Sequence, residues 1–476
     1  MLASYEPATG ALLWEGQASE IAEEIAAAEQ AVPAWAALPL VNRVETMRRF
    51  ANNVRAHEEK FADLIARETG RPLWDTKAEV HALTMSVDLA VGAISERAGS
   101  RRLEGALGAK QALRHRPLGL MAVISPAASP AKIASDQIVT ALIAGNGVLF
   151  KPSELTPATG QSLVDLMHGS GVPEHVLRCV IGGPDVGEAL IADERINGVL
   201  FTGSTSTGVA ISRATAGKPE KMLSLNMSGN NAIIVWDVAD IASAVALIVQ
   251  SAFASSGQNC LSARRLIVLE SLADTLIAEI LKLTDQLVID HPHADEAPYM
   301  GPLIDMNAAD ELTDSFLHLM SNGGKPIRHM KRPHDGLPFV THGIIDVTDM
   351  ETRPDVEYFG PLLQLIRVTD FDEAIAAAND TRFGLAAALI GGSPEHFDYF
   401  LERSRSGIVN WNRPTTFTPL ATPTGGTGLS GNHRPGGTYA ADACAYPVVS
   451  AALDQPRALI GAGLRQTLPP PRANAA

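Results

Sequence analysis

The sequence contains little cysteine, no long apolar run and no block of basic residues. Of its 476 residues, only Cys179, Cys260 and Cys444 are cysteine. This odd, scattered set fits neither a disulfide framework nor the ligand spacing of a zinc site, so we expect no metal. The absence of about 18 consecutive uncharged apolar residues argues against a membrane-spanning helix, and the first residues lack the pattern of a signal peptide. We therefore expect a cytoplasmic protein that keeps its thiols reduced.

The charge balance is acidic, with 38 Lys and Arg against 53 Asp and Glu and a formal net charge of -15. A chain with this balance repels nucleic acid and anionic membrane surfaces, and neither is expected as a partner. The hydrophobic share of 46% is enough for large buried cores that need no disulfide or metal. The composition is typical of a globular enzyme of several domains.

Short apolar runs that end in Gly or Pro alternate with helical patterns along the first half of the chain. Such runs predict buried strands, and apolar residues three and four apart predict helices. The predicted strands are 118–126, 146–154, 177–183 and 197–204. The predicted helices are 20–37, 41–69, 131–144 and 158–170. Strands separated by helices indicate crossover connections and a mostly parallel sheet.

A second series of strands begins at the turn-forming segment 227–231. Its predicted strands are 230–240, 264–271, 385–392 and 407–412. The two series together predict an α/β fold with two doubly wound parallel-sheet domains. Residues 101–116 and the tail after Pro447 stand apart from both series, and we expect the final "LPPPRANAA" to be disordered.

Two predicted strand ends carry residues suited to a phosphate or a ribose. In "VLFTGSTSTG", Gly203 and Ser204 would open a helix whose N-terminal amides can receive a phosphate. In "FKPSELTP", Glu154 could accept a ribose hydroxyl at the place where ligands bind in open α/β sheets. Each stretch has an equally ordinary structural explanation. The glycine could simply turn the strand, and Ser153 could cap a helix.

One cysteine stands in a distinctive context, "FASSGQNCLSARR", which places Cys260 directly after a Gly-Gln-Asn turn. A thiolate at such a loop can act as a nucleophile, whereas a lone cysteine out of context is more often a small buried hydrophobe. Cys179 and Cys444 lie in apolar or Ala-rich stretches, and we expect them to be structural.

Six motifs, taken together and in order, resemble the aldehyde dehydrogenase superfamily over nearly the whole chain. They are "KPSELTP", "FTGS", "GQNC", "EYFGPLL", "GIVNWNRP" and "SGNHRP", and the last two look most like the succinylglutamate-semialdehyde dehydrogenase branch. The resemblance implies a dinucleotide-binding domain over 1–226, a catalytic domain over 227–432, and an oligomerisation arm and tail formed by 101–117 and 433–476. It also implies a homodimer or homotetramer.

The resemblance also implies roles for single residues. Cys260 matches the family's nucleophile, and Glu154 at the adenosine ribose favours NAD over NADP, which stays open as an alternative cofactor. The implied cofactor-binding residues are Lys151 and Glu154 at the adenosine ribose, Gly203, Ser204 and Gly208 around the pyrophosphate, and Glu357 and Phe359 at the nicotinamide ribose. The substrate would be an aldehyde or semialdehyde that the thiolate attacks.

Two positions depart from the family pattern. Where the family has a glutamate that activates the hydrolytic water, "NMSG" places Asn226, which cannot take a proton near neutral pH. Where the family has the oxyanion asparagine, "PAASP" places Ala128, which donates nothing. Losing one oxyanion donor costs about 100- to 1000-fold in rate, and losing a general base costs about 100- to 10,000-fold. "PTGG", with Thr424 in place of an aromatic residue, suggests that the entrance to the substrate pocket has a different shape.

Three hypotheses follow from these departures. The first is an NAD-linked aldehyde dehydrogenase with altered and impaired catalytic machinery. The second is a CoA-acylating dehydrogenase, since relatives that release the acyl group to a thiol also carry Asn at the base position. The third is a dinucleotide-binding pseudoenzyme that serves as an assembly partner.

A few polar residues have two open interpretations. Lys132 and Asp136 follow the altered loop and could replace the missing base, although a solvent-facing helix surface would explain both. Arg434 in "GNHRP" could pair with a substrate carboxylate, or it could fix a loop together with His433. The histidines at 291 and 293 have no ligand spacing and are expected in a solvated loop.

Overall fold

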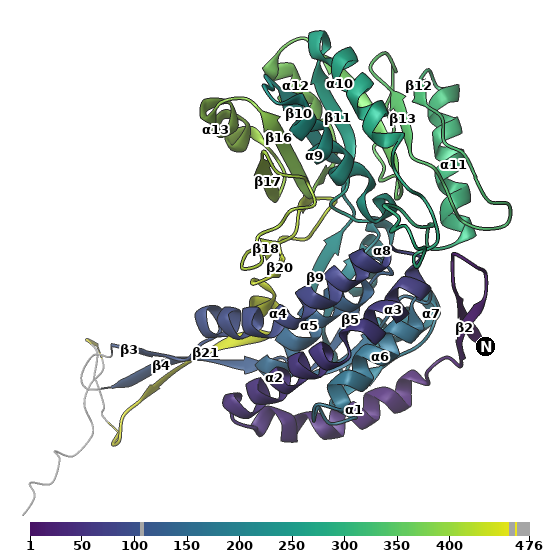
Figure 1. The fold of residues 1–476 in the computed structure, drawn as a ribbon. Helices are drawn as coiled ribbons and strands as arrows, with labels where there is room; N and C mark the ends of the chain where they lie inside the picture. The colour runs from purple at the N-terminus through teal and green to yellow at the C-terminus, as the bar shows by residue number, and fades with distance from the viewer. Residues whose placement is uncertain (105–108, 457–461, 464–476) are drawn as a thin grey trace, which may run out of the picture.

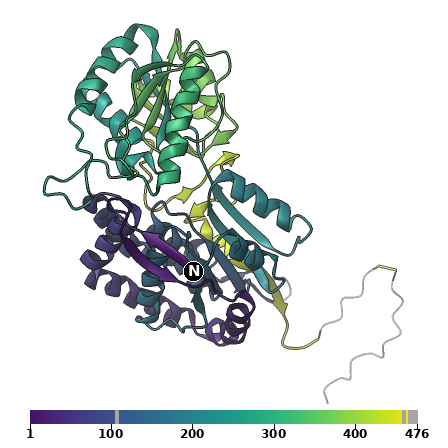
Figure 2. The ribbon, with the colours of Figure 1, turned by 90° about the vertical axis from the view of Figure 1, so that its right-hand side faces the viewer.

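The computed structural model describes residues 1–104, 109–456 and 462–463. Figure 1 shows two α/β lobes, one built mainly from the first half of the chain and one mainly from the second, with a narrow arm projecting from the first. Seen from the side in Figure 2, the arm again leaves the first lobe and points away from the second. The predicted tail segment 468–476 lies outside the described residues.

The first lobe is organised around a five-stranded parallel sheet with the order β7-β6-β5-β8-β9. The apolar runs that predicted strands form it. Its strands are β5 (Leu120–Ile124), β6 (Gly147–Lys151), β7 (Leu177–Cys179), β8 (Ile196–Gly203) and β9 (Met222–Met227). Side chains alternate between the two faces, so Met121 and Val123 belong to one core and Leu120 and Ala122 to the other.

Helices cover both faces of this sheet. One face carries α2 (Leu40–Ala56), α3 (Glu58–Thr69), α4 (Leu73–Arg97), α5 (Pro130–Ala144) and α6 (Pro157–His168). The other carries α1 (Ile21–Ala37), α7 (Pro184–Ala192) and α8 (Thr205–Thr215). The single helix predicted over 41–69 is wrong in one respect, because it divides at His57, whose backbone leaves helical geometry. The small hairpin of β1 (Leu2–Tyr5) and β2 (Leu12–Gly16) precedes these helices.

The second lobe contains a seven-stranded sheet with the order β12-β13-β14-β11-β10-β16-β17. Only β12 runs antiparallel to its neighbour. The strands are β10 (Asn231–Trp236), β11 (Ala263–Leu269), β12 (Lys325–Arg328), β13 (Gly343–Asp346), β14 (Leu362–Val368), β16 (Ala386–Gly391) and β17 (Ile408–Trp411). One face carries α9 (Ile241–Phe253) and α10 (Glu270–Thr284), and the other carries α11 (Met306–Ser321), α12 (Phe371–Asn379) and α13 (Pro394–Arg403).

The chain returns to the first lobe before it forms the arm. Helix α14 (Ala440–Ala443) and Cys444 are buried in the core that also contains α4 and α5. The buried amide of Asn146 donates to the Cys444 carbonyl at 2.8 Å, which ties this late segment to the start of β6. The arm is a three-stranded antiparallel sheet of β3 (Arg101–Leu103), β4 (Lys110–Pro117) and β21 (Ala445–Ala452).

Short elements complete the connection between the lobes: η2 (Ala254–Gly257), β15 (Phe383–Gly384), β18 (Pro423–Thr424), β19 (Thr427–Gly428) and β20 (Gly436–Gly437). Within the described part of the chain, every helix is too short or too polar to cross a membrane.

Candidate active site

The carboxyl ends of β5, β6 and β8 meet at one edge of the first sheet. The strand order reverses direction there, since β6 lies on one side of β5 and β8 on the other. In open α/β sheets, ligands bind in the crevice outside the strand ends at such a switch point. Lys151 ends β6, Gly203 ends β8, and Ala128 lies in the loop after β5. The structure therefore brings several of the predicted cofactor residues to the expected edge.

Lys151 and Glu154 form a partly exposed pair at the end of β6. The Nζ atom of Lys151 lies 3.6 Å from a Glu154 oxygen and donates to the Pro152 carbonyl at 3.3 Å. Burial lowers the pKa of Lys151, and the Glu154 charge opposes that shift. An ammonium has three donors, so this one can also bind a hydroxyl. Because the Glu154 side chain is 45% exposed, the pair is accessible to a ribose.

Helix α8 begins directly at the end of β8. The Ser204 hydroxyl caps it by accepting from the Thr207 backbone N–H at 3.3 Å. The N-terminal end of this helix is suited to a phosphate group. Close packing also requires glycine at position 208, since a Cβ there would lie 2.2 Å from Sδ of Met227 on β9.

The loop that leads to Cys260 has an unusual backbone. Ser255 and Ser256 have φ angles of 53° and 54°, which non-glycine residues rarely adopt. Gly257 has a φ of 66°, and a Cβ there would lie 2.3 Å from the Gly360 carbonyl oxygen. The Cys260 carbonyl accepts from the side-chain amide of Asn231 at 2.7 Å. The thiol residue is thus held at the start of β11 by fixed backbone contacts.

Arg264 connects this loop to the segment that contains Glu357. Its guanidinium is fully buried and donates to the carbonyls of Gly360 and Gly257 at 2.8 Å each. Its Nη2 atom lies 3.9 Å from Glu357, and the Phe359 ring centroid is 5.8 Å from its Cζ. The predicted nicotinamide-ribose residues therefore lie beside the Cys260 loop.

The electrostatic environment of Cys260 disfavours its thiolate form. The pKa of the Cys260 thiol is raised to about 12, chiefly by burial and next by the charge of Glu357. Arg264 and the backbone N–H groups of Cys260 and Leu261 act in the opposite direction. Burial also raises the pKa of Glu357, although Arg264 and the Gly229 N–H partly counter this effect.

The two substituted positions, Asn226 and Ala128, lie on separate segments of the first lobe. Asn226 is half-buried near the end of β9, and its side-chain amide borders Gly425 and Gly436 of the loop between the lobes. Three residues later, Gly229 contacts the Cys260 carbonyl so closely that a Cβ would lie 2.9 Å from its oxygen. Ala128 is half-buried two residues before α5. Neither side chain can donate or accept a proton near neutral pH.

The other polar residues that the sequence offered as candidates for catalysis or binding are either paired with a neighbour or exposed. Lys132 and Asp136 pair with each other at 2.5 Å on α5, which leaves neither positioned as a replacement base. His433 and Arg434 are exposed. His293 pairs with Asp63 at 2.8 Å, and the described residues contain no cluster suited to a metal.

A cavity of about 560 Å³ adjoins the Cys260 loop. Ser255 and Asn259 line it from the loop, and Thr416 lines it from the segment after β17. Trp74 and Asp75 at the start of α4 form another part of its wall. This volume is typical of a small-molecule site.

Sequence reasoning missed Arg264 and Asn231, two side chains that help to fix the Cys260 loop. Asn231 donates to both the Cys260 and Ser262 carbonyls, at 2.7 and 2.9 Å. Both could have been found as polar residues within predicted buried strands, since Asn231 begins β10 and Arg264 lies within β11. A polar residue in such a strand must be hydrogen-bonded and is worth singling out.

The fold and site define an α/β enzyme with two sheet-based lobes, in which the loop of Cys260 contacts Gly229, just after the end of β9 in the first lobe. The chain matches the model of the aldehyde dehydrogenase family over residues 2–448, and it belongs to this family. An N-succinylglutamate 5-semialdehyde dehydrogenase of Sphingopyxis alaskensis is 60% identical over 464 residues, which cover 98% of this chain and 96% of that protein. A protein of the same name from Novosphingobium aromaticivorans is 52% identical and covers 98% of both chains.

Solved structures have the same fold. An NADP-dependent enzyme of E. coli superposes with a TM-score of 0.88 at 28% identity and covers 95% of this chain and 94% of its own. The NADP complex of a glyceraldehyde-3-phosphate dehydrogenase from Bacillus halodurans gives 0.87 at 28% identity and 95% of both chains. The predicted fold and the prediction of an NAD(P)-dependent aldehyde dehydrogenase are confirmed. The predicted impairment finds no support in these relatives, so the pseudoenzyme hypothesis is not pursued.

The raised pKa predicts slow alkylation of Cys260 that accelerates with pH. Because the thiolate is the reacting species, the rate with iodoacetamide should rise about tenfold per pH unit between about pH 7 and pH 9.5, without a plateau. Mass spectrometry of the Cys260 peptide measures this rate. Glu357→Gln should accelerate alkylation, since it removes a charge that opposes the thiolate. A plateau near pH 8 would show that the thiol titrates normally.

Proposed function

We propose that this protein oxidises N-succinylglutamate 5-semialdehyde to the acid with NAD as cofactor. The observation that carries this proposal is the position of Cys260, near the charge of Glu357 and on the loop that lines the cavity, in a chain 60% identical to a protein named for that reaction. Glu154 supports NAD over NADP, because a carboxylate binds the ribose hydroxyls and repels a 2′-phosphate.

The residues present fit a dinucleotide. Lys151 and Glu154 would hold the adenosine ribose, the amides after Ser204 would receive the pyrophosphate, and Glu357 would hold the nicotinamide ribose. When bound, NAD supplies the acceptor for the hydride that the aldehyde loses.

The chemistry at Cys260 proceeds in two stages. Its thiolate adds to the aldehyde carbon, and the carbonyl oxygen becomes an oxyanion that the Cys260 N–H can stabilise. The adduct then expels its hydrogen with an electron pair, which leaves a thioester on Sγ. Water adds to this thioester and gives up a proton, the carboxylic acid leaves, and the thiolate is restored.

The second stage is the one that Asn226 affects. Its amide cannot take the proton from water, so we expect hydrolysis of the thioester to limit turnover. The same residue favours a second candidate function, transfer of the acyl group to a thiol such as coenzyme A. A thiolate attacks without needing a base at that position.

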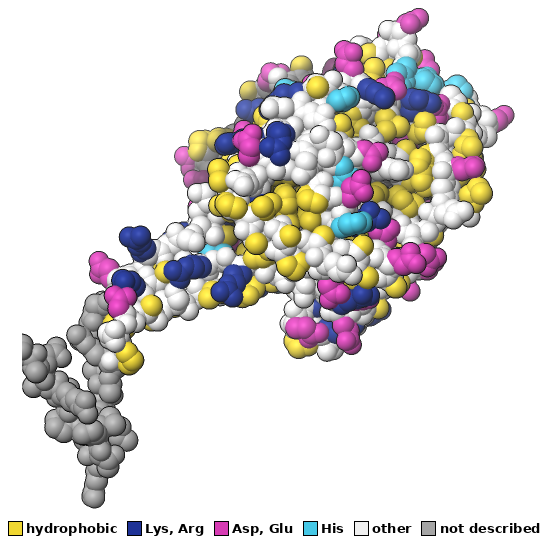
Figure 3. Space-filling model, turned by 90° about the horizontal axis from the view of Figure 1, so that it is seen from below, with side chains coloured by type: hydrophobic (Ala, Val, Ile, Leu, Met, Phe, Trp, Pro, Cys, Tyr) yellow, Lys and Arg dark blue, Asp and Glu magenta, His cyan; other side chains and the backbone are white. Residues whose placement is uncertain are grey.

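We also propose a homodimer or homotetramer formed through the arm. Large apolar side chains are exposed there, with Val449 at 71% and Leu453 at 44%. Basic side chains accompany them, including Arg114 and Arg116 on β4, and Figure 3 shows Lys and Arg gathered along the arm. Exposed apolar strands are suited to pairing with another copy. A reducing compartment suits the proposal, since Cys260 must remain a thiol.

Cys260→Ala should abolish NADH formation from N-succinylglutamate 5-semialdehyde, because the other two thiols, Cys179 and Cys444, pack in or against the core of the first lobe and away from Glu357. Its affinity for NAD should be nearly unchanged, since the proposed cofactor contacts lie elsewhere. Absorbance at the NADH band and calorimetric titration measure the two quantities. Residual turnover in this variant would contradict the covalent mechanism.

Restoring both substituted positions tests the water and thiol alternatives. Asn226→Glu combined with Ala128→Asn should raise turnover in water by about 100-fold, since a base and an oxyanion donor each contribute at least that much. Wild-type and variant are compared with and without coenzyme A. Acyl transfer would be established if coenzyme A strongly stimulates the wild-type protein but not the variant. An unchanged turnover of the variant in water would contradict the proposal that thioester hydrolysis is rate-limiting.

Glu154→Gln should shift the cofactor preference toward NADP. The change removes the charge that repels a 2′-phosphate while it keeps a hydrogen-bonding side chain, so the ratio of kcat/KM for NADP to that for NAD should rise about tenfold. Glu188→Gln, an exposed carboxylate on α7, is the matched control. An unchanged ratio would exclude Glu154 from the ribose site.

A further inference from the structure

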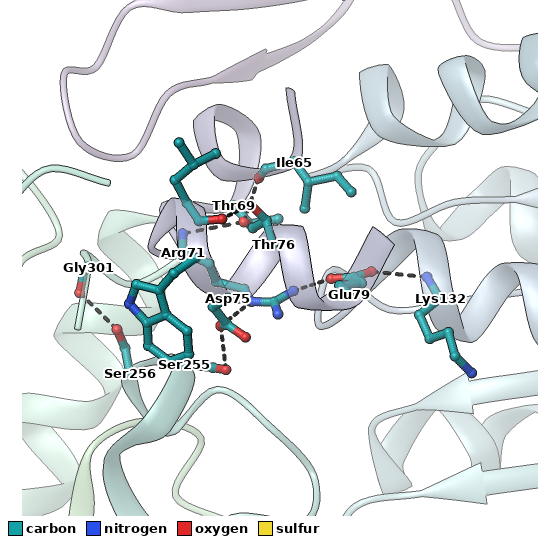
Figure 4. Close-up of polar contacts among 12 residues, drawn as sticks. Ile65, Thr69, Arg71, Asp75, Thr76, Glu79, Lys132, Ser255, Ser256 and Gly301 are labelled. Atoms are coloured by element: carbon teal, nitrogen blue, oxygen red, sulfur yellow. Dashed lines mark hydrogen bonds and ion pairs between the residues drawn. The ribbon is translucent and has the colours of Figure 1, made fainter. Parts of the chain in front are cut away.

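The loop that carries position 128 and the loop that leads to Cys260 are joined by a continuous series of polar contacts. Figure 4 shows this series crossing the start of α4, from Lys132 on α5 through Glu79, Arg71 and Asp75 to Ser255. None of these contacts was evident from the sequence, because their members come from three separate parts of the chain.

Glu79 holds the first turn of α5. One of its carboxylate oxygens accepts from the backbone N–H groups of Ala131 and Lys132 at 3.0 Å each. Ser129, the residue before the helix, has a φ of 46° and makes no side-chain cap. A carboxylate at a helix N-terminus satisfies the free amides and the helix dipole. The path of the loop that contains Ala128 therefore depends on Glu79.

Arg71 lies in the middle and contacts two carboxylates. Its guanidinium pairs with Glu79 and donates through Nε to Asp75 at 2.9 Å. The three side chains are only 6%, 2% and 14% exposed, respectively. Burial alone would raise the pKa of Asp75, but Arg71 brings it below the ordinary value, so the carboxylate is charged. The planar guanidinium suits this double role, which a lysine ammonium cannot reproduce.

The far end of the series is the loop before Cys260. Asp75 accepts from the Ser255 hydroxyl at 2.6 Å, and the Ser256 hydroxyl donates to the Gly301 carbonyl at 2.9 Å. Both serines, like Ser129 at the other loop, have left-handed backbone. Such conformations persist only where surrounding contacts enforce them, and Asp75 supplies one of those contacts.

We propose that Arg71 is a positioning residue that, through Glu79 and Asp75, fixes the loop of position 128 relative to the loop of Cys260. The catalytic part of this proposal rests on the proposed function. Because Ala128 offers no donor, the oxyanion relies on backbone N–H groups, and their placement follows the placement of these loops. A shift of about 1 Å in such a group can cost 100-fold in rate.

The test compares Arg71→Lys and Ser255→Ala with the wild-type protein. Both changes should lower kcat for the semialdehyde about tenfold or more while the KM for NAD stays within about twofold. Both should also raise the rate of Cys260 alkylation about threefold, since a released loop exposes the thiol. Ser255→Ala removes a single hydroxyl, so it provides a folded variant even if Arg71→Lys is unstable.

Arg178→Lys is the matched control, because Arg178 forms a partly buried ion pair with Glu24 away from the site. It should lower the melting temperature without changing either rate. Equal losses of kcat in the control, or wild-type kcat and alkylation in both test variants, would overturn the proposal. Alkylation needs neither aldehyde nor cofactor, so a changed rate in protein that fails to oxidise the semialdehyde would support positioning and reject the proposed function.

Discussion

The buried guanidinium of Arg264 is the interaction on which the geometry of the site depends. A charge inside a protein is tolerated only when hydrogen bonds replace its lost water. Arg264 obtains them from the carbonyls of Gly257 and Asn259, just before Cys260, and from the carbonyl of Gly360. The requirement to solvate one charge therefore determines where the thiol loop and the Glu357 segment lie. Burial lowers the pKa of Arg264, and the Glu357 charge opposes this shift.

The same cation and Glu357 give the thiol two opposing neighbours. Glu357 disfavours the thiolate and Arg264 favours it, while burial has the largest effect and raises the pKa of the thiol. A ligand that lies beside Glu357 and donates hydrogen bonds to it would weaken the repulsion between this carboxylate and the Cys260 thiolate. The pKa of the thiol would then fall. If Glu357 holds a ribose as proposed, the arrangement would couple occupation of that site to the fraction of Cys260 present as thiolate. Such perturbed groups at a cleft are typical of a reaction centre.

The sequence predicted the two sheets because buried parallel strands leave a local signal, an apolar run closed by Gly or Pro. It missed the break at His57, where both flanking helices have the same periodicity. Cys260, Lys151 and Glu357 were identifiable from short motifs. Arg71 and Glu79 were not, because the loops that they hold lie far away in sequence and a charged residue in a helix gives no sign of what it will meet. The placement of Ala441 and Cys444 in the first core was missed for the same reason.

The return of the chain to its first lobe has a consequence for synthesis. Residues 440–444 fill part of the core around α4 and α5, so that core cannot be completed when the second lobe begins to emerge from the ribosome. At about 5–20 residues per second, the stretch between β9 and α14 takes roughly 10–40 s to make. During this interval, Met47, Phe50 and Leu142 belong to an unfinished core. The first lobe is thus the last to complete its core, although most of its residues are made first.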